Sequence, residues 1–522
     1  MVGARDGGAS TGTVNHTSGT LDIVGGQLWL GQNANDANGK SAGTYNLNGG
    51  ILNVNDWIGI GREGGNGTLK VSGGTLTKNG AAGTHMVVGQ GNSTNTGLLE
   101  ITGGLVDLKV GQLWVGENSA GTATLSGTGQ LNVNAIQIAR DATTYPGLLQ
   151  LNGGTLRTGR IFGGVGVANA EFNGTTIIAT ANQTAFIEGL DSADIKANGF
   201  TIDTNGFSVA VGTADNFGQV LTGTGGITKL GAGTLTLNSP NTYAGATTVS
   251  AGKLAVSASS LATGAVTVAN GATFGVNVAA LGQKTQPSAL TLGSSNLDID
   301  VGATGNTIEA PLDIAGTLTL NGTAASTLIN VSGTNWFLGQ FPLIGYDTLA
   351  GTGGYPSIKL GTLPVGMTAT LVHNTANKTI DLNVTRLNAP TWTGLLSDQW
   401  NTTENNWRDE IGGNETNYAN GDSVSFRDDP FALDIQIPAN VTPGAYVLFA
   451  NEVSNYSLAG AGKITGTTRL IKQLAGSVTL NTAIHDFTGG VRLEGGSTVI
   501  GALSNGGLAS PIGAASADPA NL

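Results

Sequence analysis

Apolar and polar residues alternate with a period of two along most of the chain, in short stretches that end at glycine, asparagine or serine. Alternation with this period places successive side chains on opposite faces of a β-strand. We find no sustained series of apolar residues at positions i, i+3 and i+4, which an amphipathic helix would require. The pattern predicts an all-β protein made of short strands.

One motif, two apolar residues around a central residue, recurs along the first third of the chain and ends each time at a small residue. The first copy begins with Leu28-Trp-Leu, and the copies end at Gly31, Gly61, Gly89, Gly116 and Ala139. A second motif, with a central pair of glycines, lies between these copies, as in residues 45–52 (YNLNGGIL) and 149–156 (LQLNGGTL). A unit this short cannot bury its apolar side chains alone, so neighbouring units must stack. We therefore predict a right-handed parallel β-helix, or β-solenoid.

A different unit begins near residue 222. Residues 225–256, with KLGAGTLTLN at 229–238 as their first half, closely resemble the passenger-associated, or autotransporter-associated, β-strand repeat of bacterial surface and secreted proteins. A degenerate second copy runs through residues 462–500, where KQLAGSVTLN at 472–481 matches the first half. The resemblance covers about 30 residues in each copy and many fixed positions, so chance does not explain it.

The resemblance implies a parallel β-helix passenger that is exported and stays outside the cell or at the surface of the outer membrane. The Gly-Gly motifs of residues 10–165 and the segment at 392–427 are similar to repeats of the same broad group of exported bacterial proteins. The first residues lack the apolar segment of a signal peptide, and residues 510–522 look like the middle of another repeat. We expect a piece of a longer protein that is anchored through parts outside this sequence.

We divide the chain into five parts. Residues 285–388 lose the regular repeat and gain larger side chains, which suits a cover over the exposed strand edges at a solenoid end. Three tryptophans, Trp392, Trp400 and Trp407, are expected to form a small core of their own. The parts are a Gly-Gly repeat solenoid (1–221), a passenger-associated repeat that continues it (222–284), a solenoid end with an irregular β cap (285–388), a Trp-rich β module (389–455) and a second, degenerate passenger repeat (456–522).

Composition and charge narrow the classes of function. The chain has 522 residues, 85 of them glycine, with 11% charged residues and a formal net charge of −12. Because an acidic surface repels phosphate backbones, we expect no nucleic-acid partner. The chain has no cysteine, which excludes disulfides and thiolate chemistry. No apolar run is long enough for a membrane-spanning helix, and we expect a monomer.

Two glycine-rich matches to functional motifs are better explained as turns of the solenoid. Residues 59–64 (GIGREG) fit the dinucleotide fingerprint, but a strand pattern follows at 66–71, where that motif needs a helix. Residues 64–68 (GGNGT) resemble a calcium-binding repeat but have threonine where the ligand aspartate must stand. We predict neither a cofactor nor a metal ion in this chain.

Titratable residues give only a weak case for catalysis. The histidines, His16, His85, His373 and His485, are far apart and lack the spacing of metal ligands. Enzymes of the β-helix class need clustered carboxylates on one outer face. The best local match is Asp298 with Asp300, which share one face of a predicted strand and which we interpret as a solvated face. We therefore predict no catalytic residue.

Outward aromatic residues are the strongest indication of binding. Since Leu28 and Leu30 point inward, Trp29 points outward, and Trp114 holds the equivalent place. Trp57 lies one residue before the motif that ends at Gly61, and it is also expected on the outer face. Such rings could stack on sugar rings or contact a protein, or they could cover neighbouring coils. We select Trp29, Trp57 and Trp114 as the candidate surface contact, with surface glycans or proteins of a host or neighbouring cell as partners.

The sequence favours a non-enzymatic, exported structural or adhesive passenger that presents a solenoid at the bacterial surface. The alternative is a carbohydrate-active β-helix enzyme, either a polysaccharide lyase or a hydrolase, or a glycan-binding module. A third reading is a phage or secreted fibre, which would form a trimer. The position of the carboxylates on the coils distinguishes the first two.

Overall fold

Almost all regular structure in this protein is β-strand, as the alternation predicts. The computed structural model describes residues 1–4, 10–32, 41–91, 94–141, 144–212, 218–261, 263–305, 307–333, 336–364, 366–387, 389–409, 413–480 and 484–516. Within them the chain forms strands β1 to β47, a single 3-10 turn at Tyr355–Ser357 and no α-helix. Nothing helical in this described part has the length and apolarity needed to cross a bilayer.

The chain divides into two compact units, which we describe separately. The first unit comprises residues 1–333, 341–361 and 373–381. The second comprises residues 334–340, 362–372 and 382–522. Strand pairing in the second unit runs across residue 455, where the sequence suggested a boundary, since β42 (Tyr446–Ala450) pairs in parallel with β44 (Arg469–Gln473). The five-part division remains a prediction.

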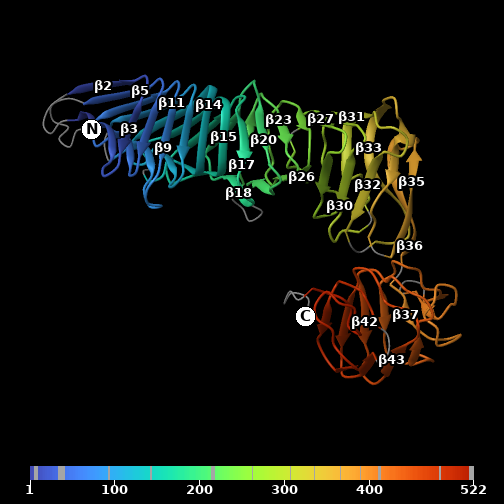
Figure 1. Cartoon of the computed structure of the whole chain (residues 1–522). Helices are drawn as coiled ribbons and strands as arrows, with labels where there is room; N and C mark the ends of the chain where they lie inside the picture. The colour runs from blue at the N-terminus through green and yellow to red at the C-terminus, as the bar shows by residue number, and fades with distance from the viewer. Residues whose placement is uncertain are drawn as a thin grey trace. The chain divides into compact units, whose positions relative to one another are not determined.

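Parallel strands of successive coils lie side by side in the first unit (Figure 1). Each early coil contributes three strands, and each strand pairs in parallel with its equivalent one coil later. The three columns are β4 (Leu28–Gln32), β7 (Ile58–Arg62), β10 (Met86–Gln90) and β13 (Leu113–Val115); β5 (Ala42–Leu47), β8 (Asn66–Val71) and β11 (Thr96–Ile101); and β6 (Ile51–Val54), β9 (Thr75–Lys78) and β12 (Leu105–Leu108). The predicted parallel β-helix is confirmed.

The core of the first unit includes columns of apolar side chains, each at one register position of successive coils. Leu28 pairs with Ile58, Ile58 with Met86, and Met86 with Leu113. None of these four residues exposes more than 3% of its surface. Full burial of one such side chain stabilises the fold by about 1.5–3 kcal/mol, and the gain repeats with every coil.

Each copy of the first motif ends at a small residue because neighbouring backbones approach closely there. Gly61 has a φ of +72°, and a Cβ on it would lie 2.2 Å from the carbonyl oxygen of Thr96 in the next coil. Glycine meets both demands because it has no side chain. Ala139, which takes this place in the last copy, also adopts a positive φ, of 52°.

Residues 225–256 continue the same stack. Ile227 pairs with Phe200 of the preceding coil and with Thr247 of the following one, and Thr247 pairs with Val266. The strands involved are β20 (Phe200–Asp203), β23 (Ile227–Leu230), β25 (Thr247–Val249) and β27 (Val266–Val268). Parallel pairing persists to β34 (Ile358–Leu360), so the first part of residues 285–388 still forms coils.

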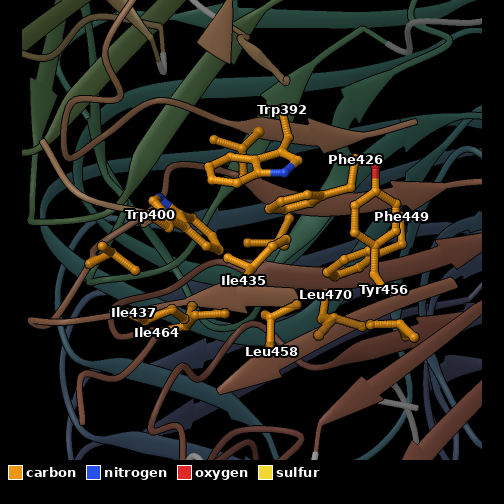
Figure 2. Packing of buried hydrophobic residues seen from close by; sticks show 14 of the residues in the cluster. Trp392, Trp400, Phe426, Ile435, Ile437, Phe449, Tyr456, Leu458, Ile464 and Leu470 are labelled. Carbon is orange, nitrogen blue, oxygen red and sulfur yellow. The ribbon is translucent and has the colours of Figure 1, made fainter. Parts of the chain in front are cut away.

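The core of the second unit contains the three tryptophans. Figure 2 shows two of them, Trp392 and Trp400. Trp392, Trp400 and Trp407 expose 2% of their surface or less, and Trp407 lies 5.0 Å from Trp392 and 5.4 Å from Trp400 between ring centroids. Phe426 packs against all three, and its ring stacks on that of Phe449 at 4.6 Å. The expectation of a separate tryptophan core needs correction, because parallel pairing of β40 (Val424–Phe426) with β42 joins the trio to the later strands.

The similar sequences at residues 229–238 and 472–481 each begin with a buried lysine. The ammonium group of Lys229 donates hydrogen bonds to the carbonyl oxygens of Leu230 (2.8 Å), Gly231 (2.8 Å) and Ala251 (3.0 Å). Lys472 donates likewise to Gln473 (2.5 Å) and Leu474 (3.0 Å). Burial lowers the pKa of Lys229 to about 8, which leaves the group charged at neutral pH. The lysine therefore supplies hydrogen bonds to carbonyls at a turn. The Leu230 carbonyl also accepts the backbone N–H of Thr204 at 3.0 Å.

Replacement of this lysine should loosen the repeat locally. We expect Lys229→Met to destabilise the coil by about 2 kcal/mol, because buried carbonyls lose charge-assisted hydrogen bonds. Hydrogen exchange of the amides in β23 and in β24 (Thr234–Leu237) measures the effect. Lys253→Met is the matched control, since Lys253 forms a partly exposed ion pair with Asp298. Equal exchange in the two variants would contradict the role of Lys229.

A neutral histidine is buried in the second unit. His485 is fully buried, and its Nδ1 accepts the backbone N–H of Ile464 at 3.1 Å. Burial lowers the pKa of His485 to about 4. The unfolded chain therefore binds a proton below its ordinary pKa of about 6.5, while the folded chain does not until about pH 4.

Acid should thus destabilise the second unit. Stability is fully present above pH 6.5 and is lost as the pH falls toward 4, by about 3 kcal/mol from this one group. Urea unfolding at a series of pH values, followed by tryptophan fluorescence, measures the loss. His485→Gln retains an acceptor for the Ile464 N–H and should remove most of the loss between pH 6.5 and 4. A wild-type slope in that variant would show that other groups carry the effect.

Candidate functional site

The three candidate tryptophans lie on the outer face of the sheet that contains β4, β7, β10 and β13. Trp29, Gly59, Val87 and Trp114 occupy one outward register position in these successive strands. Trp57 stands one residue before β7, and its carbonyl oxygen accepts the N–H of Leu28 at 3.0 Å. Sequence alternation alone places these residues on a common face, because inward and outward positions alternate along each strand.

Trp114 is the centre of a stack of planar side chains. The guanidinium of Arg140 lies 3.8 Å from the Trp114 ring centroid, and the His85 ring stacks at 4.1 Å with an angle of 25°. His85 and Arg140 come from the coils on either side of β13, so they cover opposite faces of the indole. Trp114 exposes only 7% of its surface. The idea of an open row of flat rings is therefore wrong for Trp114, whose faces are already filled.

Trp29 and Trp57 are partly exposed and differ in their partners. Arg62 lies 4.1 Å from the Trp29 ring centroid, and the Trp29 indole N–H donates to Gln27 at 2.7 Å. Trp57 meets His85 and Trp114 edge to face, at 5.0 Å and 5.5 Å between centroids. Within the described residues the Trp57 indole N–H has no hydrogen-bond partner and is not buried. Trp57 thus presents an available donor on this face.

Carboxylates hold both arginines in place. Glu63 pairs with Arg62 at 2.8 Å. Arg140 contacts Asp141 at 2.8 Å and Glu117 at 3.4 Å through the same nitrogen. These acids occupy one corner of successive coils, as the bond from the Asp141 N–H to the Glu117 carbonyl shows. Stacking and ion pairing together fix the plane of each guanidinium.

Burial shifts the pKa values of two side chains at this site. Burial and the neighbouring Asp141 raise the pKa of Glu117, although Arg140 and Arg62 oppose the shift. Burial, with Lys78 and Arg140, lowers the pKa of His85. His85 Nδ1 accepts the N–H of Gln112 at 3.0 Å, which places the ring proton on Nε2. His85 is therefore a neutral ring that packs against both Trp57 and Trp114 at neutral pH.

The corner carboxylates were not selected from the sequence, although a signal was present. These charged residues directly follow the small residue that ends a copy of the first motif. Arg62 and Glu63 follow one such residue, Glu117 follows another, and Arg140 and Asp141 follow a third. An alignment of the motif copies on their closing small residue would have placed all five charged residues at one corner of the solenoid. Coil lengths differ, however, so the sequence does not show which side chain contacts which.

The carboxylates considered from the sequence have ordinary partners on the solenoid surface. Asp298 pairs with Lys253 at 2.6 Å and accepts the side-chain amide of Asn330 at 2.8 Å. Asp300 accepts the backbone N–H of Gly302 at 2.9 Å. Residues 59–64 lead from β7 into β8, both of them strands, so the dinucleotide reading is excluded. In the described part of the chain no three histidine, aspartate or glutamate side chains gather closely enough for a metal ion.

Comparisons with known proteins agree with the parallel stack. Residues 227–256 match the model of the family described as passenger-associated-transport-repeat. The chain carries a passenger-associated transport repeat. The structure places this repeat in β23 to β26 (Lys253–Ser257), within the continuous stack of the first unit.

A curated relative of this passenger repeat protein is the adhesin BmaC autotransporter of Brucella suis biovar 1 (strain 1330). It is 28% identical to this chain over a region that covers 35% of the chain and 6% of the relative. The chain thus matches only a small part of that protein's length. No solved structure gives a significant match.

Removal of the central indole should destabilise this face. We expect Trp114→Ala to cost about 2–3 kcal/mol, because it leaves a gap between His85 and Arg140. Hydrogen exchange of β10 and β13 amides measures the loss. Trp29→Ala, which removes a partly exposed ring, serves as the control and should cost less. A similar loss in both variants, or rapid acrylamide quenching of Trp114 fluorescence, would contradict the buried stack.

Proposed function

We propose that this chain is an exported, non-enzymatic passenger that presents a β-solenoid outside the bacterial cell and supports adhesion. The observation that carries the proposal is the repeat at residues 227–256, which continues a parallel stack without a break in register. The relative named as an autotransporter adhesin supports an adhesive role. The partners would be surface glycans or proteins of a host or neighbouring cell, and the chain would act as a monomer.

The architecture suits a passenger that folds after export. Each coil satisfies its backbone on the coil before it, so folding can proceed coil by coil from any formed nucleus. The chain has no cysteine, so no disulfide interferes with export in an unfolded state. Low charge and outward threonine, serine and asparagine side chains keep a long surface soluble without a single strong electrostatic field.

A carbohydrate-active enzyme is the second candidate, and one observation favours it. Glu117 and Asp141 both contact one nitrogen of Arg140, at 3.4 Å and 2.8 Å, so their nearest oxygens are at most about 6 Å apart. Glycosidases use carboxylate pairs at roughly 5–10 Å, one of them with a raised pKa. Here, however, Arg140 also stacks on Trp114 and occupies the position between the acids and the indole.

Display on a cell surface tests the adhesive role. We expect the full chain, fused to a heterologous outer-membrane translocator, to be exposed to added protease on intact cells and to increase their attachment to epithelial or plant cells several-fold over the translocator alone. Reducing-sugar release from bacterial, plant and algal polysaccharides is measured in parallel. Turnover that disappears in Glu117→Gln would overturn the non-enzymatic reading, and display without increased attachment would overturn adhesion.

A further inference from the structure

We propose that the outer face around Trp57 binds an uncharged hexose polymer, with Arg62 and Arg140 as fixed hydrogen-bond donors. The inference rests on the adhesive function proposed above and names its ligand and its site. It departs from ring stacking on Trp29 and Trp114, because arginines already cover those indoles.

Trp57 is the residue of this face best suited to contact a ligand. Its ring is partly exposed, whereas that of Trp114 is buried. The indole N–H groups of Trp29 and Trp114 donate to Gln27 and Gln112, but that of Trp57 finds no acceptor among the described residues. An amphipathic ring with an available donor contacts the apolar face of a sugar and one of its hydroxyl groups at the same time.

The two arginines are held ready for a polar ligand. Arg62 lies between the Trp29 ring and Glu63, and Arg140 lies between the Trp114 ring and the acids Glu117 and Asp141. A guanidinium has five N–H donors in a rigid plane, and these partners do not use all of them. Because stacking has already fixed the planes, a ligand loses little side-chain freedom on binding.

The charges at this site favour a neutral ligand. Two guanidinium groups and the Lys78 ammonium are balanced by four carboxylates. The carboxylates are Glu63, Glu117, Asp141 and Asp56, and His85 is neutral. No surplus of positive charge remains for a uronate or sulfate, and the chain as a whole carries a formal charge of −12. Hydroxyl groups both donate and accept, so they match a surface that offers carboxylates and guanidinium donors together.

The spacing of the polar groups favours a polymer. Arg62 ends β7, and Arg140 follows the strand three steps further along the stack. At about 4.8 Å per step, the two groups are about 14 Å apart along the stack. A single sugar cannot reach both, whereas an extended chain that runs along the stack can contact both arginines and also Trp57, whose ring lies against His85 and Trp114.

Binding of defined polysaccharides to the purified full chain tests the proposal. The probes are yeast mannan and plant xyloglucan, which are neutral and come from different sources, and alginate and heparin, which are anionic. Biolayer interferometry should show an affinity for at least one neutral probe at least ten-fold higher than for either anionic probe. Affinity for neither neutral probe, or a preference for an anionic probe, would overturn the proposal.

Variants of Trp57 connect binding to the site. We expect Trp57→Ala to weaken the affinity at least ten-fold and Trp57→Phe, which keeps a ring but lacks the N–H, to weaken it about three-fold. Phe431→Ala, which removes a 75% exposed ring in the second unit, is the control and should bind normally. Thermal unfolding of each variant checks folding, and Trp57→Phe serves as the test if Trp57→Ala unfolds. Wild-type affinity in a folded Trp57 variant would refute the site.

The two proposals fail in different ways. If displayed cells attach but the purified chain binds no neutral polysaccharide, only the glycan inference is wrong. Attachment that depends on surface proteins of the target cell, and that survives removal of its glycans, leads to the same conclusion. If the chain binds a neutral polysaccharide but displayed cells do not attach, the adhesive role is wrong and the binding site stands.

Discussion

Hydrogen bonding between parallel strands in register is the interaction on which this protein depends. Each coil donates to the next through its backbone, as from Ile58 to His85 and from Met86 to Gln112. A shift of one residue would turn every inward side chain outward, so the register also fixes the aliphatic column. The closing glycines serve this register, because a side chain at Gly61 would collide with the backbone of the next coil. Core, turns and surface are therefore consequences of one repeated alignment.

The repeat at residues 227–256 and the similar sequence at 472–481 show how far this alignment tolerates change. Lys229 and Lys472 cap turn carbonyls in both copies, so the buried charge is retained where the turn shape is retained. Gly231, with a φ of +76°, corresponds to Leu474, which keeps a positive φ of 61°. A left-handed leucine costs about 1–2 kcal/mol relative to glycine. The backbone is thus held in this conformation by the coils on either side and by the lysine, against the preference of the residue.

Much of this architecture could be predicted from the sequence, because alternation and spacing are local properties. The inward places of Leu28 and Leu30 and the outward place of Trp29 follow from a period of two. The contact between Trp114 and Arg140 does not follow, since it depends on how many residues each coil uses. The same limit explains the tryptophan core of the second unit. The clustering of Trp392 with Trp407 is suggested by composition, but its union with Phe449 requires the parallel register of β40 and β42.

The spacing of the coils also explains why the candidate site is made of planar side chains. Strands in a sheet lie about 4.7–4.9 Å apart, which is close to the distance at which aromatic and guanidinium groups stack. Planar side chains on neighbouring coils can therefore stack, as those of His85, Trp114 and Arg140 do at 4.1 and 3.8 Å. Their backbones hold different register positions, since Trp114 pairs with Val87 and Gln137. Such a stack adds a second packed layer outside the sheet without any change in the core. Because the inward positions and the closing glycines fix the register, most outward positions are free to vary. A surface site can therefore arise wherever planar and charged side chains of neighbouring coils reach one another.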